Sequence, residues 1–213
     1  MNQELYPSTK IVVYDVETTG FTKSDEVIQF SAIVMNDTLY TESLVNFYCN
    51  TQVPISTGAF STHGIDKARL FQLSEKKVFE DNWLEFIESL RGNNIIWVSW
   101  SQGGFDERLI NQTLANNGLE DYFHFNYYKD LQKCREQRES VFDLMGAVCR
   151  KIGRSRISLQ AAATKLPYTK AQINHVYDGI AAQAPNVDFS QRYHNSLYDT
   201  FVTFLILNHY FGV

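Results

Sequence analysis

The sequence predicts an α/β fold in which a central mixed sheet of five strands is flanked by α-helices. The first fifty residues form β-rich segments separated by a short turn, a pattern typical of three antiparallel strands in a meander. Helical periodicity then takes over, and another short β-rich run precedes a further helix, which indicates added parallel strands. No repeat, low-complexity tract or Pro/Gly/Ser-rich linker divides the chain, so we expect residues 1–213 to form a single domain.

The predicted strands are runs rich in β-branched and aromatic residues. The first ends at Asp15, the second covers residues 26–35 and the third covers residues 39–49, after a turn at residues 36–38. A fourth run, residues 94–100, is almost continuously apolar. Such a run is expected of a central parallel strand, because helices cover both faces of a parallel sheet.

Apolar residues at helical spacing predict three helices. Residues 78–90 place apolar side chains at steps of one, three and four residues, which puts them on one face of a helix. Residues 105–115 and 196–210 show a similar spacing. We expect these helices to pack their apolar faces on the sheet, with further helices in much of the remaining chain.

The composition and the cysteine content exclude several classes of protein. Hydrophobic residues make up 44% and charged residues 20% of the chain, which is typical of a globular protein. No stretch reaches the ~20 apolar residues of a membrane span, and the first ten residues lack the pattern of a secretion signal, so we expect a cytoplasmic location without membrane association. Cys49, Cys134 and Cys149 show no Cys-x-x-Cys spacing, which argues against a disulfide framework or a zinc site.

The charge is unevenly distributed along the chain. Residues 129–170 contain ten Lys or Arg and four Asp or Glu, a local charge of +6, which leaves −11 for the rest of a chain whose net charge is −5. The densest part is residues 150–156, "RKIGRSR". This segment is either a solvated helix end and loop or a surface that faces phosphates, and the sequence favours neither interpretation.

Two carboxylates end the first strand. In "IVVYDVETTG", residues 11–20, an apolar run leads to Asp15 and Glu17. Side chains two positions apart in a strand point to the same face, so these two like charges are expected to lie close together. Such a pair is unfavourable unless a cation or a proton joins it, and the pattern therefore indicates a cation site.

Two further segments offer partners for this pair. Asp106 follows a glycine pair at the predicted start of a helix, where the helix dipole alone also favours a carboxylate. His194 and Asp199 are five residues apart, about 140° around a helix, so they would not share a helical face. They converge only if His194 lies in a loop and Asn195 or Ser196 caps the following helix.

In this order and spacing, the segments resemble the motifs of the DEDDh exonucleases, the DnaQ-like 3′ to 5′ exonuclease family of the RNase H-like superfamily. The first motif, Asp-x-Glu-Thr-Thr-Gly after an apolar strand, is residues 15–20. The second motif is Phe105-Asp106, and the third, His followed five residues later by Asp, is His194 and Asp199. The resemblance extends over nearly the whole chain and implies an RNase H-like fold.

The resemblance implies a phosphodiester hydrolase in which Asp15, Glu17, Asp106 and Asp199 bind two Mg²⁺ or Mn²⁺ ions. Hard divalent ions prefer oxygen ligands, and two of them about 3.5–4 Å apart stabilise both the attacking and the leaving oxygen of a phosphodiester. His194 is the implied general base, because a histidine with an ordinary pKa near ~6.5 accepts a proton close to neutral pH. These five residues are the predicted catalytic set.

The resemblance also implies contacts with the substrate. Thr18, Thr19 and Gly20 would form a floor for the terminal nucleotide and hold its 3′ hydroxyl. His63, in "STHGID", either contacts the terminal nucleotide or caps a turn. Phe105 either stacks on a base or packs in the core, and both pairs of alternatives stay open in the sequence.

The predicted function is the release of 5′-mononucleotides from the 3′ end of single-stranded nucleic acid. DNA is favoured and RNA is possible, because "DVETTG" is similar to the DNA-proofreading branch, whereas "VSWSQGGFD" is closer to RNA-directed members. The alternative is a subunit that binds 3′ ends without cutting them, within a polymerase or nuclease complex. The presence of all five predicted catalytic residues favours the enzyme.

Overall fold

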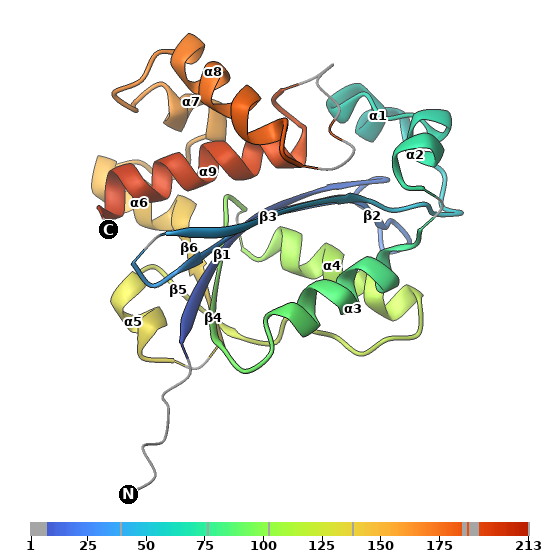
Figure 1. Ribbon diagram of the computed structural model, residues 1–213, viewed down its shortest axis with the longest axis horizontal. Helices are drawn as coiled ribbons and strands as arrows, with labels where there is room; N and C mark the ends of the chain where they lie inside the picture. Colours follow the sequence, from blue (N-terminus) through green and yellow to red (C-terminus); the bar gives the residue numbers. More distant parts are fainter. Residues whose placement is uncertain are drawn as a thin grey trace, which may run out of the picture.

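A twisted sheet between two layers of helices forms the centre of the protein (Figure 1). The computed structural model describes residues 8–212 except for 39, 76, 102, 138, 185, 186 and 188–191. Within these residues the sheet has six strands in the order β3-β2-β1-β4-β6-β5. The strands are β1 (Thr9–Thr18), β2 (Val27–Asn36), β3 (Thr41–Tyr48), β4 (Asn94–Ser99), β5 (Asn126–Tyr128) and β6 (Glu139–Asp143).

The strand pairing confirms the predicted mixed sheet. β1, β2 and β3 pair antiparallel, and β4, β6 and β5 continue the sheet through parallel pairs. The expected number of five strands was one too low. β5 has only three residues, which is too short for a detectable alternation, and it is a strand because it pairs with β6. β1 also continues beyond Asp15 to Thr18.

The helices cover both faces of the sheet. α6 to α9 pack on one face, α3 and α4 pack on the other, and α1 and α2 lie beside the end of the sheet (Figure 1). α3, α4 and α9 confirm the three predicted helices. The helices of the described residues are α1 (Thr57–His63), α2 (Lys67–Leu73), α3 (Phe79–Ser89), α4 (Phe105–Asn116), α5 (Leu131–Arg135), α6 (Leu144–Ile152), α7 (Leu159–Ala163), α8 (Lys170–Ala181) and α9 (Ser196–Phe211).

β1 divides the core in two through the alternation of its side chains. Ile11 and Val13 belong to the apolar cluster that includes α9, whereas Val12 belongs to the cluster that includes α3 and α4. Asp15 and Glu17 continue the series of Ile11 and Val13, because side chains two positions apart share a face. The register of β1 therefore directs both carboxylates toward α9.

β1 and β4 separate at their carboxyl ends. β1 pairs with β2 as far as Thr18, but it pairs with β4 only as far as Val13, which lies opposite Val98. α4 begins shortly after β4, next to this opening. In open α/β sheets, ligands bind in the crevice outside the carboxyl ends of the strands.

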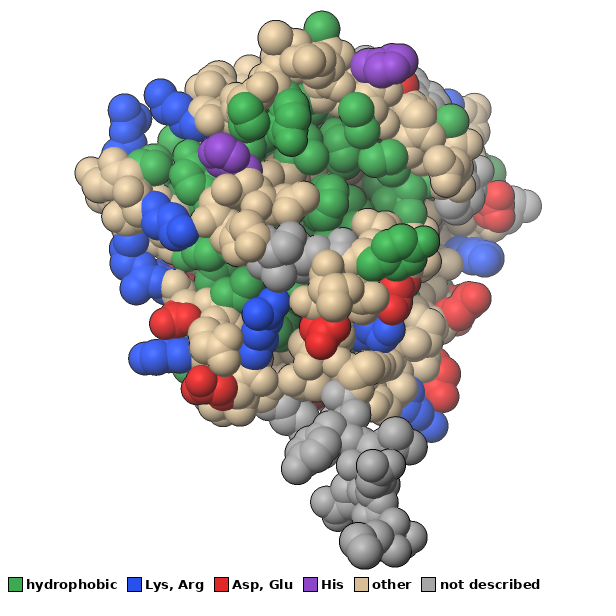
Figure 2. All heavy atoms as spheres, turned by 60° about the vertical axis from the view of Figure 1, so that its left-hand side comes forward, with side chains coloured by type: hydrophobic (Ala, Val, Ile, Leu, Met, Phe, Trp, Pro, Cys, Tyr) green, Lys and Arg blue, Asp and Glu red, His purple; other side chains and the backbone are tan. Residues whose placement is uncertain are grey.

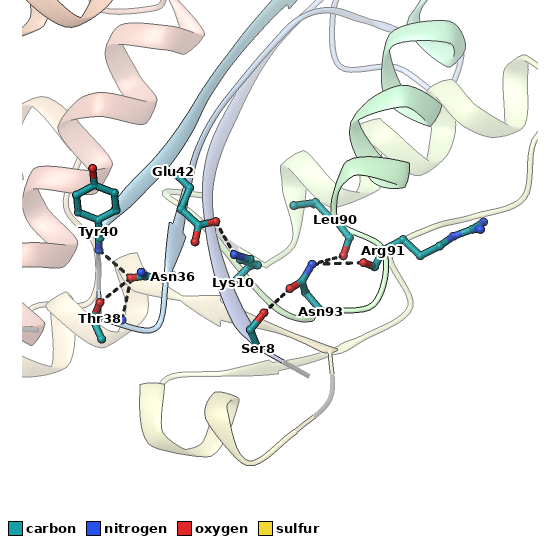
Figure 3. A network of polar contacts seen from close by, with 9 residues as sticks. All are labelled: Ser8, Lys10, Asn36, Thr38, Tyr40, Glu42, Leu90, Arg91 and Asn93. Carbon is teal, nitrogen blue, oxygen red and sulfur yellow. Dashed lines mark hydrogen bonds and ion pairs between the residues drawn. The ribbon is translucent and has the colours of Figure 1, made fainter. Parts of the chain in front are cut away.

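The opposite end of β1 is held by polar contacts (Figure 3). Lys10 forms an ion pair with Glu42 of β3. Asn36 Oδ1 accepts hydrogen bonds from the N–H groups of Thr38 and Tyr40 at 3.1 and 2.9 Å, which closes the predicted turn between β2 and β3. These contacts fix the amino end of the strand whose carboxyl end carries Asp15 and Glu17.

Two further expectations concern the cysteines and the membrane. Cys49, Cys134 and Cys149 are buried free thiols. Among the described residues, no helix has both the length and the apolar character that crossing a bilayer would need.

Candidate active site

Three carboxylates from two elements converge at the carboxyl end of β1. Asp15, Glu17 and Asp199 each offer an oxygen atom, and these atoms all lie within 4.8 Å of one another. Asp15 and Glu17 come from β1, and Asp199 comes from the first turn of α9. Glu17 and Asp199 are each 8% exposed, so their carboxylates are largely withdrawn from water.

The first turn of α9 positions Asp199. Asn195 caps the helix, and its side chain accepts a hydrogen bond from a backbone N–H group of the first turn. The hydroxyl oxygens of Ser196 and Ser31 of β2 are 2.6 Å apart, and the Thr200 hydroxyl donates to the Ser31 carbonyl at 3.2 Å. These small side chains let α9 lie close to the sheet, which brings Asp199 to the carboxylates of β1.

His194 lies in the loop before α9, and Asn195 forms the predicted cap. The backbone of His194 has a positive φ of 63°, and its N–H group donates to Asp199 Oδ2 at 3.0 Å. The left-handed backbone turns the chain just before the helix begins. His194 and Asp199 are therefore neighbours, although they are five positions apart in the sequence.

Burial and mutual repulsion raise the pKa values of these carboxyl groups. Burial is the largest cause for Asp15 and Glu17, whose pKa values lie well above the ordinary range, and the charges of Asp106 and Asp199 raise both further. Burial also raises the pKa of Asp199 to about 7. No lysine or arginine of the described residues forms an ion pair with any of the four groups.

The cluster has the properties of a cation site. Oδ1 of Asp199 is buried and has no hydrogen-bond partner within the described part of the chain. Buried polar atoms in native proteins normally have a partner, so this oxygen points to a ligand. The donors are all carboxylate oxygens, which suit hard divalent ions such as Mg²⁺ and Mn²⁺. A bound cation would satisfy Oδ1 and reduce the repulsion between the three side chains.

Asp106 lies beside this cluster. It stands in the first turn of α4, after Gly103 and Gly104, whose φ values of 66° and 75° define a left-handed backbone that favours glycine. Its oxygens are not part of the 4.8 Å group, but its charge raises the pKa of both Asp15 and Glu17. Burial is the main cause that raises the pKa of Asp106 itself to about 8. All four predicted carboxylates therefore interact at one end of the sheet.

A family comparison agrees with this geometry. The family model described as Exonuclease, of the RNase T type, matches residues 12–207. The chain belongs to this exonuclease family. The match confirms the resemblance to DnaQ-like exonucleases, and it includes the five predicted catalytic positions.

Solved structures of Escherichia coli exonuclease I share the fold of this exonuclease-family chain. The complex with a dA16 oligonucleotide is 17% identical, with a TM-score of 0.60 over 94% of this chain and 41% of that chain. The zinc-bound complex with single-stranded DNA is 16% identical, with a TM-score of 0.58 over 96% and 41%. The chain thus spans about two fifths of the length of exonuclease I. No curated protein matches it.

Internal contacts hold the predicted nucleotide floor of the exonuclease-family site, Thr18 to Gly20. The Thr18 hydroxyl donates to the Gly20 carbonyl at 2.8 Å, and the Thr19 hydroxyl donates to Asp25 Oδ1 at 2.8 Å. A Cβ atom on Gly20 would lie 2.8 Å from the Asp25 carboxylate oxygens, so glycine is required for this close approach. Both hydroxyls shape the turn, and its contact with a nucleotide stays a prediction.

His63 holds the same turn from α1. Its Nδ1 atom accepts a hydrogen bond from the Ile65 N–H group at 3.1 Å, so the Nε2 atom carries the proton and donates to the Thr18 carbonyl at 3.1 Å. His63 is 4% exposed, and burial lowers its pKa. With both ring nitrogens engaged, the geometry fits the turn-capping interpretation, and a contact with substrate stays a prediction.

An aromatic pair borders the site, and only one member was predicted. Phe105 is half-buried, and its ring centroid lies 5.7 Å from that of Phe21, which is 62% exposed. Arg108 lies over the Phe105 ring at 5.2 Å from its centroid. An apolar side chain directly after the motif at residues 15–20 is the signal that could have indicated Phe21.

A second missed residue is Glu107, which is 2% exposed. Its carboxylate accepts hydrogen bonds from the Tyr14 hydroxyl and, at 3.3 Å, from the Ser99 hydroxyl. Because Tyr14 points to the opposite face of β1 from Asp15, Glu107 lies on the α3 and α4 side of the sheet. Neighbouring acids at a helix start are common, so the sequence carries no signal that separates Glu107 from a solvated charge.

The raised pKa values predict an unusual dependence of stability on pH without divalent ions. A carboxyl group whose pKa rises from 3.8 to about 7 on folding, as for Asp199, stabilises the fold fully below pH 4 and loses this contribution as pH rises through 7. In EDTA, the Tm of Asp199→Asn should therefore be close to that of the unaltered protein at pH 4 and about 5 °C or more higher at pH 8.

Thermal unfolding from pH 4 to pH 8, followed by circular dichroism, measures this difference. Mn²⁺ should raise the Tm of the unaltered protein more at pH 8 than at pH 5, because metal ions and protons compete for the same oxygens. A Tm difference between the two proteins that stays constant over this pH range would contradict the prediction.

Proposed function

We propose that this chain is a metal-dependent 3′ to 5′ exonuclease that releases 5′-mononucleotides from single-stranded nucleic acid. The observation that carries the proposal is the group of half-buried Asp15 with buried Glu17 and Asp199, in which one Asp199 oxygen lacks a protein partner among the described residues. Without a bound cation, repulsion between these carboxylates lowers the stability of the fold. Their presence together on an exonuclease fold therefore fits a catalytic site.

The proposed ligands of two Mg²⁺ or Mn²⁺ ions are the four carboxylates. Asp15 would bridge the two positions, Glu17 and Asp199 would each favour one, and Asp106 would contribute directly or through water. Bound divalent ions supply electrostatic stabilisation of the attacking and leaving oxygens of the phosphodiester. The zinc-bound form of exonuclease I supports a divalent-ion site on this fold.

His194 is the proposed general base. Its backbone N–H group is fixed on Asp199, and its imidazole forms no hydrogen bond with any described residue. The ring is therefore available to accept a proton from the attacking water, which is the contribution expected of a general base. This arrangement leaves Asp199 in contact with both the proposed base and the proposed metal positions.

Single-stranded DNA is the favoured substrate, because exonuclease I binds single-stranded DNA oligonucleotides on the same fold. The exposed ring of Phe21, next to Phe105, offers a platform on which a terminal base would stack in DNA or RNA. RNA stays possible. Gln102, in the segment that is similar to RNA-directed members, lies outside the described residues.

Phe21→Ala tests the stacking platform. Base stacking on an aromatic ring contributes about 1–3 kcal/mol, so we expect KM for single-stranded oligonucleotides to rise about tenfold with little change in kcat. Tyr40→Ala is the matched control, because Tyr40 is also an exposed aromatic residue, 72% exposed, near the amino end of β1 (Figure 3). Equal KM values for the two variants would contradict a role of Phe21 in binding.

The function itself is tested by a time course on 5′-labelled oligonucleotides. Single-stranded DNA, single-stranded RNA and duplex DNA are incubated with Mg²⁺, Mn²⁺ or EDTA. We expect stepwise shortening from the 3′ end with release of 5′-mononucleotides, and no shortening in EDTA. If Mn²⁺ raises Tm but no substrate is shortened, the chain is instead a subunit that binds 3′ ends within a polymerase or nuclease complex.

A further inference from the structure

We infer that α6, α7 and α8 present a second nucleic-acid-binding surface that holds the single strand upstream of its 3′ end. This inference rests on the proposed function, which places the 3′ end at Asp199. The surface is formed by residues 144–177, which contain six Lys or Arg and no Asp or Glu, in a chain with a net charge of −5. We call it the acid-free surface.

The six cations of the acid-free surface are all exposed. Figure 2, which turns the side of α6 and the C-terminus toward the viewer, shows lysine and arginine side chains along the left margin, with acidic side chains lower down. The surface spans the end of α6, the connections on both sides of α7 and the start of α8. The six residues are Arg150, Lys151, Arg154, Arg156, Lys165 and Lys170.

Two of these cations serve the fold, and four do not. Arg150 and Lys151 donate to backbone carbonyls, and the Lys151 ammonium lies 4.5 Å from the centre of the Phe211 ring. The side chains of the other four form no hydrogen bond or ion pair within the part of the chain that the structure describes. Four exposed positive charges without a local counter-charge attract a polyanion. These four residues are Arg154, Arg156, Lys165 and Lys170.

The acid-free surface is joined to the helix that carries Asp199. The Tyr198 hydroxyl donates to Asn174 Oδ1 of α8 at 3.0 Å, and the rings of Tyr198 and Tyr177 are 4.9 Å apart. Lys170 begins α8 four residues before Asn174, which is about 6 Å along the helix axis. A strand whose 3′ end lies at Asp199 therefore reaches the surface within a few nucleotides.

The uncharged groups of the surface also fit a single strand. Exposed Ser155 offers a hydroxyl of the kind that contacts phosphates and sugars, and Tyr168, 50% exposed, offers a ring for stacking. Tyr168 and Val176 are the large exposed apolar side chains among the described residues 144–177. The other exposed side chains of these residues are mostly cationic or polar, which suits nucleic acid.

The test compares long and short single strands. The variant Arg154→Gln/Arg156→Gln/Lys165→Gln/Lys170→Gln removes the four unpartnered cations. For an oligonucleotide of about 16 nucleotides we expect KM and the binding Kd at low salt to rise at least tenfold, and the slope of log Kd against log salt to fall by about 2–3. For a dinucleotide, KM and kcat should stay unchanged, because its single phosphodiester lies at Asp199 and the strand ends before the surface.

Two double variants are compared with a control that loses the same charge. They are Arg154→Gln/Arg156→Gln and Lys165→Gln/Lys170→Gln. Lys77→Gln/Arg91→Gln alters two exposed cations at either end of α3, on the other face of the sheet. If the control weakens binding of the long strand as much as the two doubles, the effect is one of net charge and the inference is overturned.

Binding by fluorescence anisotropy separates this inference from the proposed function. If the unaltered protein cuts nothing, the proposed function fails, but a Kd for the long strand that depends on the four cations still supports the surface. If the quadruple variant binds and cuts the long strand as the unaltered protein does, the surface holds no nucleic acid and the inference fails. If the quadruple variant then binds polyglutamate more weakly than the unaltered protein does, the surface is assigned to an acidic protein.

Discussion

Asp15→Asn is expected to lower kcat for single-stranded DNA at least about a thousandfold while the fold stays intact. Asp15 belongs to the group whose oxygens lie within 4.8 Å of one another, so asparagine removes a charge from the centre of the proposed metal site. The loss should appear in kcat more than in KM, because a metal ligand acts mainly in the transition state. Steady-state cleavage of a 5′-labelled oligonucleotide in Mn²⁺ measures it.

Asp37→Asn is the matched control for Asp15→Asn, because Asp37 is an exposed aspartate in the turn between β2 and β3. It should cut DNA as the unaltered protein does. Without divalent ions, Asp15→Asn should have a higher Tm than the unaltered protein at pH 8, since it removes the cost of burying the Asp15 charge and its repulsion with Asp106, Asp199 and Glu17. A folded Asp15→Asn protein with more than a tenth of the original kcat would refute the proposed metal site.

His194→Asn should lower kcat by about 10²–10⁴-fold and leave KM nearly unchanged, as expected when a general base is lost. Asparagine is the appropriate replacement because it tolerates the left-handed backbone that His194 adopts, with φ of 63°, better than most residues. The N–H group that donates to Asp199 Oδ2 is retained, so the helix start should keep its geometry.

Metal binding distinguishes a base from a structural residue. Mn²⁺ should raise the Tm of His194→Asn as much as that of the unaltered protein, because the four carboxylates are retained, while kcat stays low. His209→Gln, an exposed histidine in the last turn of α9, is the control and should behave like the unaltered protein. If His194→Asn retained the kcat of the unaltered protein, another group would be the base.

Much of the carboxylate site could be predicted because each part rests on local geometry. The two-residue spacing of Asp15 and Glu17 fixes their common face in any strand, and the cap at Asn195 fixes where α9 begins. The convergence of β1 with α9 is a long-range contact, which the sequence indicates only through the order of the family motifs. The family comparison over residues 12–207 supports that order.

The parts that the sequence did not reveal depend on contacts between distant segments. β5 is a strand only because β6 lies next to it. Glu107 is buried because the Tyr14 hydroxyl reaches it from the centre of the sheet. His63 gave two interpretations in the sequence, and the partners of its ring nitrogens, Ile65 and Thr18, became visible only in three dimensions.

The early separation of β1 from β4 has a consequence for how the protein tolerates an empty site. Up to Val13, β1 is paired on both sides, whereas from Tyr14 to Thr18 its ladder continues with β2 alone. The repulsive carboxylates are therefore confined to the one-sided part of the strand. Opening of this end alone would break few backbone hydrogen bonds, so we expect repulsion between the empty carboxylates to loosen the carboxyl end of β1 before the doubly paired part.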